Sequence, residues 1–354
     1  MTLSGRGIVD RDGPVVAYLG WHGLGNLGDD AIYDAVRNRL PGATFVDLPR
    51  LPHQLLHATV TSALGVRTFR RGSQVVGGGT LVGRRQWRPL VKRGLALTRP
   101  NPSHAIGIGV EDPVFVGRGS GSGGGELKRW APILAEFHTV SVRGPRSAEL
   151  LSDIGIEVAV TGDPALLLPY PDGAPEDGLI GVNVGFGDDL WGHDPRKLAG
   201  QVSAAVQQLA GRGYRFVGVL MNPGDRRWTE LALTDVAADV VQPADAAAAA
   251  RELARCSAAI VTRLHAGVLA ALSATPVVTL EYQPKCRDFA LSIDDERSLV
   301  RTDQVSAGSL VERLLDALAN APQIRTSTRA AVGRLRQRLD TEYAALGRQL
   351  GLTS

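Results

Sequence analysis

The sequence predicts an α/β protein with two doubly wound, Rossmann-like domains that face a central cleft. Short β-branched runs alternate with helix-like stretches along most of the 354 residues, as in parallel sheets covered by helices. Glycine is abundant, with 42 residues, and aromatic residues make up only 5% of the chain. The recurrence of apolar runs between helix-like stretches favours an α/β protein over an all-β one. The length and the 44% hydrophobic content are enough for two domains with separate cores.

The first domain is expected to cover residues 1–170. Its buried parallel strands are recognised as short β-branched runs that end in glycine or polar residues. These strands are Val15–Trp21, Ala43–Leu48, Gln74–Val76, Ala105–Val110, Thr139–Arg143 and Val158–Thr161. Helices are expected at Asp30–Leu40 and at Pro145–Ile154, because Pro145 suits a first helical turn and Gly155 suits a stop.

The second domain is expected to cover residues 171–325, after a join near residues 170–178 where proline, glycine and acidic residues mix. Its expected strands are Leu179–Gly185, Phe216–Leu220, Asp239–Gln242, Ala258–Thr262 and Pro276–Tyr282. Its expected helices are Lys197–Leu209, Trp228–Ala238, Ala244–Arg255 and Ala266–Ser273. A C-terminal unit, residues 326–354, contains a long charged helix over Thr326–Leu350, which we expect to pack back on the first domain.

The charge balance argues against a nucleic-acid partner. Thirty-nine basic residues face 36 acidic ones, so the formal net charge is only +3. Six cations nevertheless cluster in one short stretch, which we interpret as a solvated basic face or as a surface for an anionic acceptor or lipid headgroups. These cations are Arg84, Arg85, Arg88, Lys92, Arg93 and Arg99.

Cysteine usage and hydropathy predict a cytoplasmic protein. Cys256 and Cys286 form neither a disulfide framework nor a metal-binding spacing, so both are expected to be reduced. The polar N-terminus lacks an apolar signal core, and no stretch approaches the ~18 apolar residues of a membrane span. A peripheral contact with the inner face of the cell membrane stays open.

The run Gly117–Gly125, GRGSGSGGG, predicts a flexible segment. It is interpreted as a surface loop or, alternatively, as a lid over the cleft.

The glycines of Gly23–Gly28 match the outline of a dinucleotide-binding turn, with Asp47 about 20 residues later. However, Asp29 and Asp30 at the helix start would compete with a pyrophosphate for the same amides. Asp30 is expected to be structural, whereas Asp29 either caps the helix or faces a sugar hydroxyl.

A second turn, Gly77-Gly78-Gly79, lets the backbone approach a ligand at the carboxyl end of a strand.

Three strands are followed by cations. Arg143 ends one strand, Arg263 and His265 follow a second, and Lys285 follows a third. The carboxyl ends of strands are where open α/β sheets bind ligands, and arginine offers paired donors to phosphate or carboxylate. Each cation alone is ordinary, but together they suit a small ligand that carries both groups, such as phosphoenolpyruvate.

These segments together resemble the polysaccharide pyruvyl transferase family. The matching stretches, in the family's order, are GNLGDDAI at Gly25–Ile32, VVGGGTL at Val75–Leu81, SVRGPRSAELL at Ser141–Leu151, TGDPALLL at Thr161–Leu168, TRLHAGVLAALSATP at Thr262–Pro276 and EYQPKCRDF at Glu281–Phe289. The sequence departs from the family pattern at Thr275, where glycine is common, and in the insert Gly117–Gly125.

The resemblance implies a GT-B-like fold and a pyruvyl transferase that forms a pyruvate ketal on a sugar, with phosphoenolpyruvate as donor. The sugar belongs to a polysaccharide, a glycolipid or a lipid-linked saccharide. The expected donor-binding residues are Arg143, Arg263, Leu264, His265 and Lys285. The expected catalytic residues are Arg263, His265 and Asp29, and the acceptor side is assigned to Asn26, Asp29, Gly78 and Gly79. No cofactor and no metal are expected, because no cluster has metal-ligand spacing.

The sequence is also compatible with three other functions. A nucleotide-sugar glycosyltransferase could use the same cleft for a diphosphate. An NAD-dependent enzyme could use the first glycine turn, and a non-catalytic carbohydrate-binding protein could have kept the fold.

Overall fold

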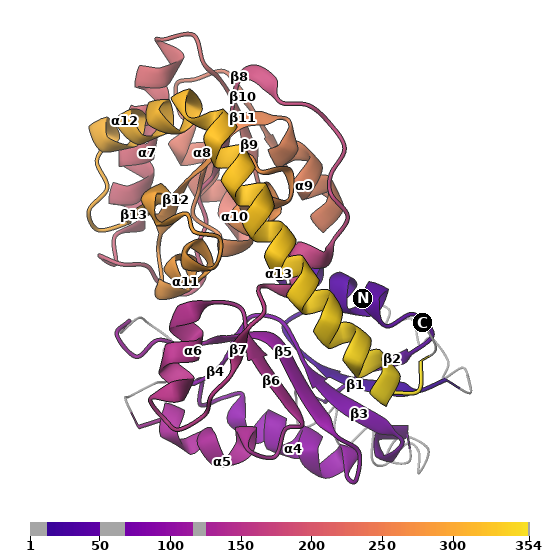
Figure 1. The fold of residues 1–354 in the computed structure, drawn as a ribbon. Coiled ribbons are helices and arrows are strands. Elements are labelled where there is room, and N and C mark those ends of the chain that lie inside the picture. The colour runs from indigo at the N-terminus through magenta and orange to yellow at the C-terminus, as the bar shows by residue number, and fades with distance from the viewer. Residues whose placement is uncertain (1–12, 50–67, 116–124, 353–354) are drawn as a thin grey trace, which may run out of the picture.

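The computed structural model describes residues 13–49, 68–115 and 125–352, which form two α/β lobes (Figure 1). Within these residues the first sheet has seven parallel strands in the order β2-β1-β3-β5-β6-β7, with β4 paired to β5. The strands are β1 Val15–Leu19, β2 Thr44–Asp47, β3 Gly72–Val76, β4 Thr80–Val82, β5 Ser103–Val110, β6 Thr139–Val142 and β7 Ala159–Val160. The helices of this lobe are α1 Leu27–Arg39, α4 Arg88–Thr98, α5 Ala131–Leu134 and α6 Pro145–Ser152, with the 3-10 turns η1 Leu127–Arg129 and η2 Pro164–Leu167.

The second sheet has six parallel strands in the order β10-β9-β8-β11-β12-β13. They are β8 Glu176–Asn183, β9 Arg215–Val219, β10 Ala238–Val241, β11 Cys256–Val261, β12 Val277–Glu281 and β13 Leu299–Arg301. Its helices are α7 Pro195–Ala210, α8 Arg226–Ala232, α9 Ala246–Ala254, α10 Leu264–Ser273, α11 Pro284–Ser292, α12 Ala307–Ala319 and α13 Ala321–Gln349, with η3 Pro223–Asp225 and η4 Glu296–Ser298. Two parallel sheets covered by helices confirm the predicted fold class.

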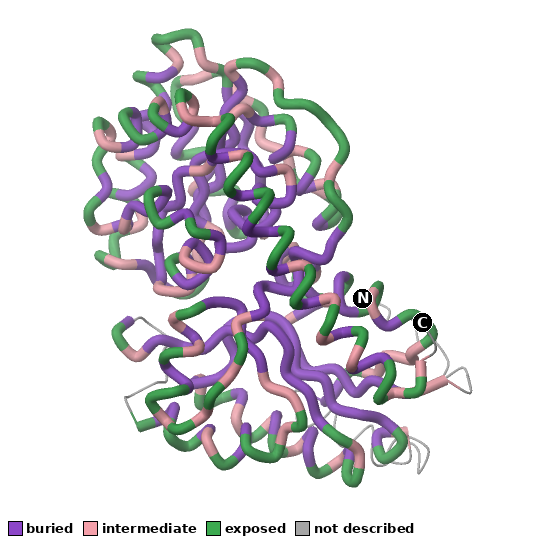
Figure 2. The backbone as a smooth tube through the Cα atoms, viewed as in Figure 1, coloured by how far each residue is buried: buried purple, intermediate pink, exposed green. Residues whose placement is uncertain are grey.

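The two lobes do not have separate cores, contrary to the sequence-based expectation. One continuous apolar cluster joins side chains of α1 and of η2 with side chains of the second sheet and of α13. Helix α13 runs from the second lobe onto the first (Figure 1). Its residues Leu335, Leu339 and Tyr343 belong to this shared core, and the face of the helix that points away from the core is exposed (Figure 2). A second cluster fills the opposite face of the first sheet, under α4, α5 and α6.

Several predicted boundaries are wrong for local reasons. The helix predicted at Trp228–Ala238 ends at Ala232, because Asp235 adopts a φ of 67°, which a right-handed helix cannot accommodate. Ala238 already begins β10. Helices α4, α5, α11 and α12 and strands β4 and β13 were not predicted, and α13 begins at Ala321 rather than at Thr326.

The basic stretch near residue 84 is partly neutralised by acids from later segments. Arg84 pairs with Glu111 at 2.9 Å, and Arg88 pairs with Glu126 at 2.7 Å. The interpretation as a solvated basic face therefore holds for Arg99, which is exposed, but not for Arg84, whose side chain is only 16% exposed. The predicted loop 117–125 lies almost wholly outside the described residues.

Candidate functional site

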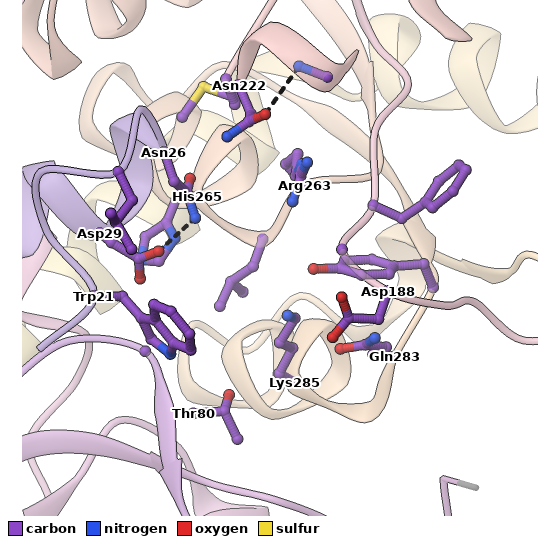
Figure 3. Close-up of a pocket in the computed structure, with 18 of the residues that line it drawn as sticks. Trp21, Asn26, Asp29, Thr80, Asp188, Asn222, Arg263, His265, Gln283 and Lys285 are labelled. Carbon is purple, nitrogen blue, oxygen red and sulfur yellow. Dashed lines mark hydrogen bonds between the residues drawn. The ribbon is translucent and has the colours of Figure 1, made fainter. Parts of the chain in front are cut away.

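A cavity of about 580 Å³ lies between the carboxyl ends of the two sheets (Figure 3). Loops after β1, β3, β8 and β9 and the first turns of α10 and α11 line it. Of the residues predicted for the site, those lining the cavity are Asn26, Asp29, Gly79, Arg143, Arg263, Leu264, His265 and Lys285. Gly78 does not line the cavity, because at a φ of 71° its missing side chain would face Ile32 and Tyr18 in the core. The structure therefore brings together both predicted turns and all four predicted cations.

Arg143 is a buried cation at the base of the cavity, with 1% of its surface exposed. Its Nη2 donates to Oγ1 of Thr80 at 2.8 Å. Two carboxylates balance its charge, with Asp163 at 3.8 Å from Nη1 and Asp288 at 3.9 Å from Nε. The guanidinium lies against Gly109, where a Cβ would come within 2.6 Å of Nη2, so glycine is required there.

Asp288 connects the two lobes, and sequence reasoning missed it. It lies on α11 of the second lobe, yet its carboxylate accepts the N–H of Arg146 at 2.9 Å and the Oγ–H of Ser147 at 2.6 Å. These contacts cap the start of α6, whose first amides have no partners within the helix. The side of the cavity at Arg143 is thus held by a residue of the other lobe.

Arg263 precedes α10 and is fixed by a carboxylate. Its Nη2 and Nε donate to one oxygen of Asp225 at 2.6 and 3.0 Å, and Asp225 is fully buried. Burial lowers the pKa of Arg263, but the charge of Asp225, the hydrogen bonds to it and the neighbouring Tyr282 and Asp29 together outweigh burial, and the pKa is raised. No side chain of the described residues caps α10, so its first amides and the positive end of its dipole point toward the same place. This corner of the cavity suits an anion.

Asp29 is the acid that faces these cations. It is 9% exposed, and Nδ2 of Asn26 donates to its carboxylate at 2.5 Å. Burial raises the pKa of Asp29, although the charges of His265 and Lys285 and the hydrogen bond from Asn26 act in the opposite direction. A carboxyl group with a raised pKa can hold or accept a proton near the cations.

Backbone amides of the first glycine turn already donate hydrogen bonds to side chains of the same segment. The amide of Gly23 donates to Asp30 at 2.6 Å and the amide of Gly28 donates to Asn26 at 3.2 Å. Asp47, the expected ribose partner of a dinucleotide, pairs instead with His22 at 2.9 Å. The turn therefore presents few free amides to a pyrophosphate.

Lys285 has a positive charge whose contact in the described residues is an aromatic ring rather than an acid. Its Nζ lies 4.8 Å from the centre of the Tyr282 ring, a cation–π contact. Within the described ranges no acid forms an ion pair with it. Figure 3 shows its side chain directed into the cavity, below Arg263.

Aromatic side chains on both lobes line the cavity, and they were not predicted. Trp21 follows β1 and packs edge-on against buried Trp87 at 4.8 Å. On the other lobe Phe186 and Trp228 lie 5.5 Å apart. Such apolar faces suit sugar rings, and the position of Trp21 directly after a strand was the available signal.

Two further properties concern the described residues as a whole. No group of three or more His, Cys, Asp or Glu side chains in them could hold a metal ion. No helix in the same part of the chain is long and apolar enough to cross a bilayer.

Comparisons with known proteins agree with this architecture. The family model described as polysaccharide pyruvyl transferase matches residues 26–284. No curated protein sequence matches the chain.

Solved structures share the fold at low sequence identity. MnaA of S. aureus, solved with UDP, superposes with a TM-score of 0.60 at 11% identity, covering 96% of this chain and 98% of its own. UDP-GlcNAc 2-epimerase from Neisseria meningitidis, bound to UDP-GlcNAc, superposes with a TM-score of 0.57 at 12% identity, covering 94% of this chain and 99% of its own. A UDP-glucosyltransferase from Polygonum tinctorium superposes with a TM-score of 0.56 at 13% sequence identity, covering 97% of this chain and 100% of its own. These likenesses confirm the GT-B-like fold and nothing beyond it.

Proposed function

Because the chain belongs to the polysaccharide pyruvyl transferase family, we propose that it transfers the pyruvyl group of phosphoenolpyruvate to two hydroxyls of a sugar and releases phosphate. The observation that carries this proposal is the gathering of Arg143, Arg263, His265 and Lys285 in one cavity. Phosphoenolpyruvate bears a phosphate and a carboxylate on three carbons, so it needs several cations close together.

In this proposal the donor lies between α10 and α11. Arg263 and the first turn of α10, including the backbone of Leu264, bind one anionic group, and Lys285 binds the other. Arg143 is buried beneath them and adds positive potential while its own hydrogen bond goes to Thr80. A fixed cationic site of this kind stabilises charge without reorganisation during the reaction.

The chemistry requires proton transfer at defined atoms. A proton adds to the methylene carbon of the donor, and the adjacent carbon becomes cationic and accepts the oxygen of the first hydroxyl. The bond from that carbon to the phosphate oxygen then breaks, and the second hydroxyl closes the ketal ring. One of the two hydroxyl protons balances the new methyl group and the other leaves with phosphate as hydrogen phosphate.

Asp29 and His265 are the proposed acid–base groups. Burial raises the pKa of Asp29, which lets this carboxyl exchange a proton with a sugar hydroxyl. His265 delivers a proton or donates a hydrogen bond to phosphate. Asn26, Gly79 and the face of Trp21 border the acceptor side next to Asp29. Every step uses side chains and an activated donor, so the proposal includes no cofactor and no metal.

The acceptor is proposed to be a sugar of a polysaccharide, glycolipid or lipid-linked saccharide. A lipid-linked acceptor would bring the protein to the inner face of the membrane without a spanning helix.

A transfer assay tests this proposal. The protein is incubated with phosphoenolpyruvate and a panel of methyl hexopyranosides, and phosphate release is followed together with the mass of the sugar products. We expect a pyruvylated sugar with the wild-type protein and none with His265→Ala. Turnover of UDP-sugars with no pyruvylated product would support the glycosyltransferase alternative instead.

A further inference from the structure

A carboxylate of the first lobe faces the histidine of the second lobe at the back of the cavity. Asp163 follows β7, and its Oδ1 accepts the N–H of Ala165 at 3.0 Å. Its other oxygen, Oδ2, lies 3.5 Å from Nε2 of His265. Asp163 is fully buried and His265 is only 8% exposed. The two groups therefore meet across the lobe interface, away from bulk water.

The two facing atoms lack hydrogen-bond partners in the part of the chain that the structure describes. Among the described residues, Oδ2 of Asp163 and Nε2 of His265 are both buried without a hydrogen-bond partner. Leaving such atoms unpaired is costly, so a small movement that joins them is favourable. The same oxygen of Asp163 also lies 3.8 Å from Nη1 of Arg143, farther than from Nε2 of His265.

Asp163 is held as an anion. Burial raises its pKa, but the charges of His265 and Arg143 and the N–H of Ala165 outweigh burial, and the pKa is lowered. An ionised carboxylate only accepts hydrogen bonds, so Nε2 of His265 must be the protonated nitrogen on this side.

The other ring nitrogen is held by a close approach of α1. A Cβ at Gly28 would collide with Nδ1, Cγ and Cβ of His265. Only glycine lets the backbone of α1 lie this close to the ring. Nδ1, unlike Nε2, is not among the buried atoms without a partner in the described residues, and His265 lines the cavity. Asp163 on one side and Gly28 on the other determine how the imidazole is turned.

We propose that Asp163 is a positioning residue that holds the Nε2 proton of His265 and thereby makes Nδ1 the nitrogen that works on the donor. This inference rests on the proposed function. The Nε2 proton stays between the two side chains, and only a proton at Nδ1 is shared with or passed to the donor. Because the pair joins two lobes, His265 is oriented for the reaction only while the lobes are docked.

Substitutions can separate the two ring nitrogens. Asp163→Asn removes the charge but keeps an oxygen that can accept from Ala165. In His265→Asn the amide nitrogen lies as many bonds from Cβ as Nδ1 does, and in His265→Gln as many as Nε2. The affinity for phosphoenolpyruvate is measured by calorimetric titration for each variant and for Asp163→Asn combined with His265→Gln.

We expect Asp163→Asn to weaken phosphoenolpyruvate binding roughly tenfold, in line with a charged hydrogen bond. In the His265→Gln background the same change should have no further effect, whereas an effect that acts through Arg143 would persist there. His265→Asn should bind more tightly than His265→Gln. Asp295→Asn, which neutralises a buried acid outside the cavity, is the matched control and should bind as the wild type does.

The outcomes distinguish this inference from the proposed function. If the wild-type protein does not bind phosphoenolpyruvate, the proposed function fails and the inference fails with it. If the wild type binds but Asp163→Asn is unchanged, or its effect persists without His265, only the inference is overturned. Tighter binding by His265→Gln than by His265→Asn also overturns it, and this comparison does not depend on the folding of Asp163→Asn.

Discussion

Adding one methyl group at Gly28 should disable the site without changing any of its chemical groups. Gly28 lies in the first turn of α1, and its Cα approaches His265 so closely that a Cβ would overlap three atoms of that side chain. The imidazole cannot simply retreat, because it is nearly buried and Asp163 faces its Nε2. Gly28→Ala must therefore displace either the ring or the start of the helix.

Two opposing terms set the change in stability. Overpacking a filled interior costs about 1–3 kcal/mol, whereas alanine is favoured over glycine within a helix by up to about 1 kcal/mol. The free energy of unfolding should therefore fall by roughly 0–3 kcal/mol. The transfer rate should fall much further, because a misplacement of about 1 Å can reduce a rate on the order of 100-fold.

Urea denaturation and the rate of pyruvyl transfer measure these two effects. Gly333→Ala is the matched control, since Gly333 lies within α13 and a Cβ there meets nothing within 4 Å. The control should gain up to about 1 kcal/mol of stability and keep the wild-type rate. A Gly28→Ala protein with the wild-type rate would refute the idea that this glycine fixes His265.

Three further changes test the supporting contacts. Asp225→Asn leaves the guanidinium of Arg263 with little exposure and without its charge partner, so the free energy of unfolding measured in urea should fall by about 3–5 kcal/mol. A fall near zero would mean that water reaches this pair. Asp288→Ala removes the cap of α6 and one link between the lobes, and the free energy of unfolding should fall by about 1–2 kcal/mol; an unchanged midpoint would contradict the cap. Because burial raises the pKa of Asp29 in the folded state above the ordinary 3.8, this group stabilises the fold at low pH, and that stability is lost as the pH rises through the raised pKa. In parallel denaturation curves, the free energy of unfolding of Asp29→Asn minus that of the wild type should therefore be larger at pH 7 than at pH 4. The same difference at both pH values would show that the carboxyl group titrates normally.

The strand-end cations could be predicted from the sequence because their positions follow from local patterns. Arg143 and Arg263 each follow a short buried strand and precede a helix, and parallel strands bring such ends to one edge. The resemblance to a family then made the joint pattern specific.

The acids that hold these cations could not be predicted in the same way. Asp163 lies 102 positions before His265, and the carboxylate that caps α6 comes from α11 of the other lobe. Local periodicity carries no information about contacts across lobes, which depend on how α13 and η2 join the two sheets.

Gly78 was misplaced for a related reason. A glycine run shows that the backbone turns sharply, but not which glycine faces the ligand. In the structure Gly79 lies beside Trp21 and Asp29, whereas Gly78 faces the core.

Thermal denaturation in the presence of phosphoenolpyruvate shows whether the cavity between the lobes binds the proposed donor. A ligand that binds only the folded state stabilises it by about 2.7 kcal/mol at a hundredfold excess over Kd. We predict a higher Tm with millimolar phosphoenolpyruvate, a smaller shift in Lys285→Met, and an unchanged shift in Lys197→Met, an exposed lysine outside the cavity. No shift in Tm with phosphoenolpyruvate, together with a clear shift with UDP or NAD, would rule out phosphoenolpyruvate as the donor bound in this cavity.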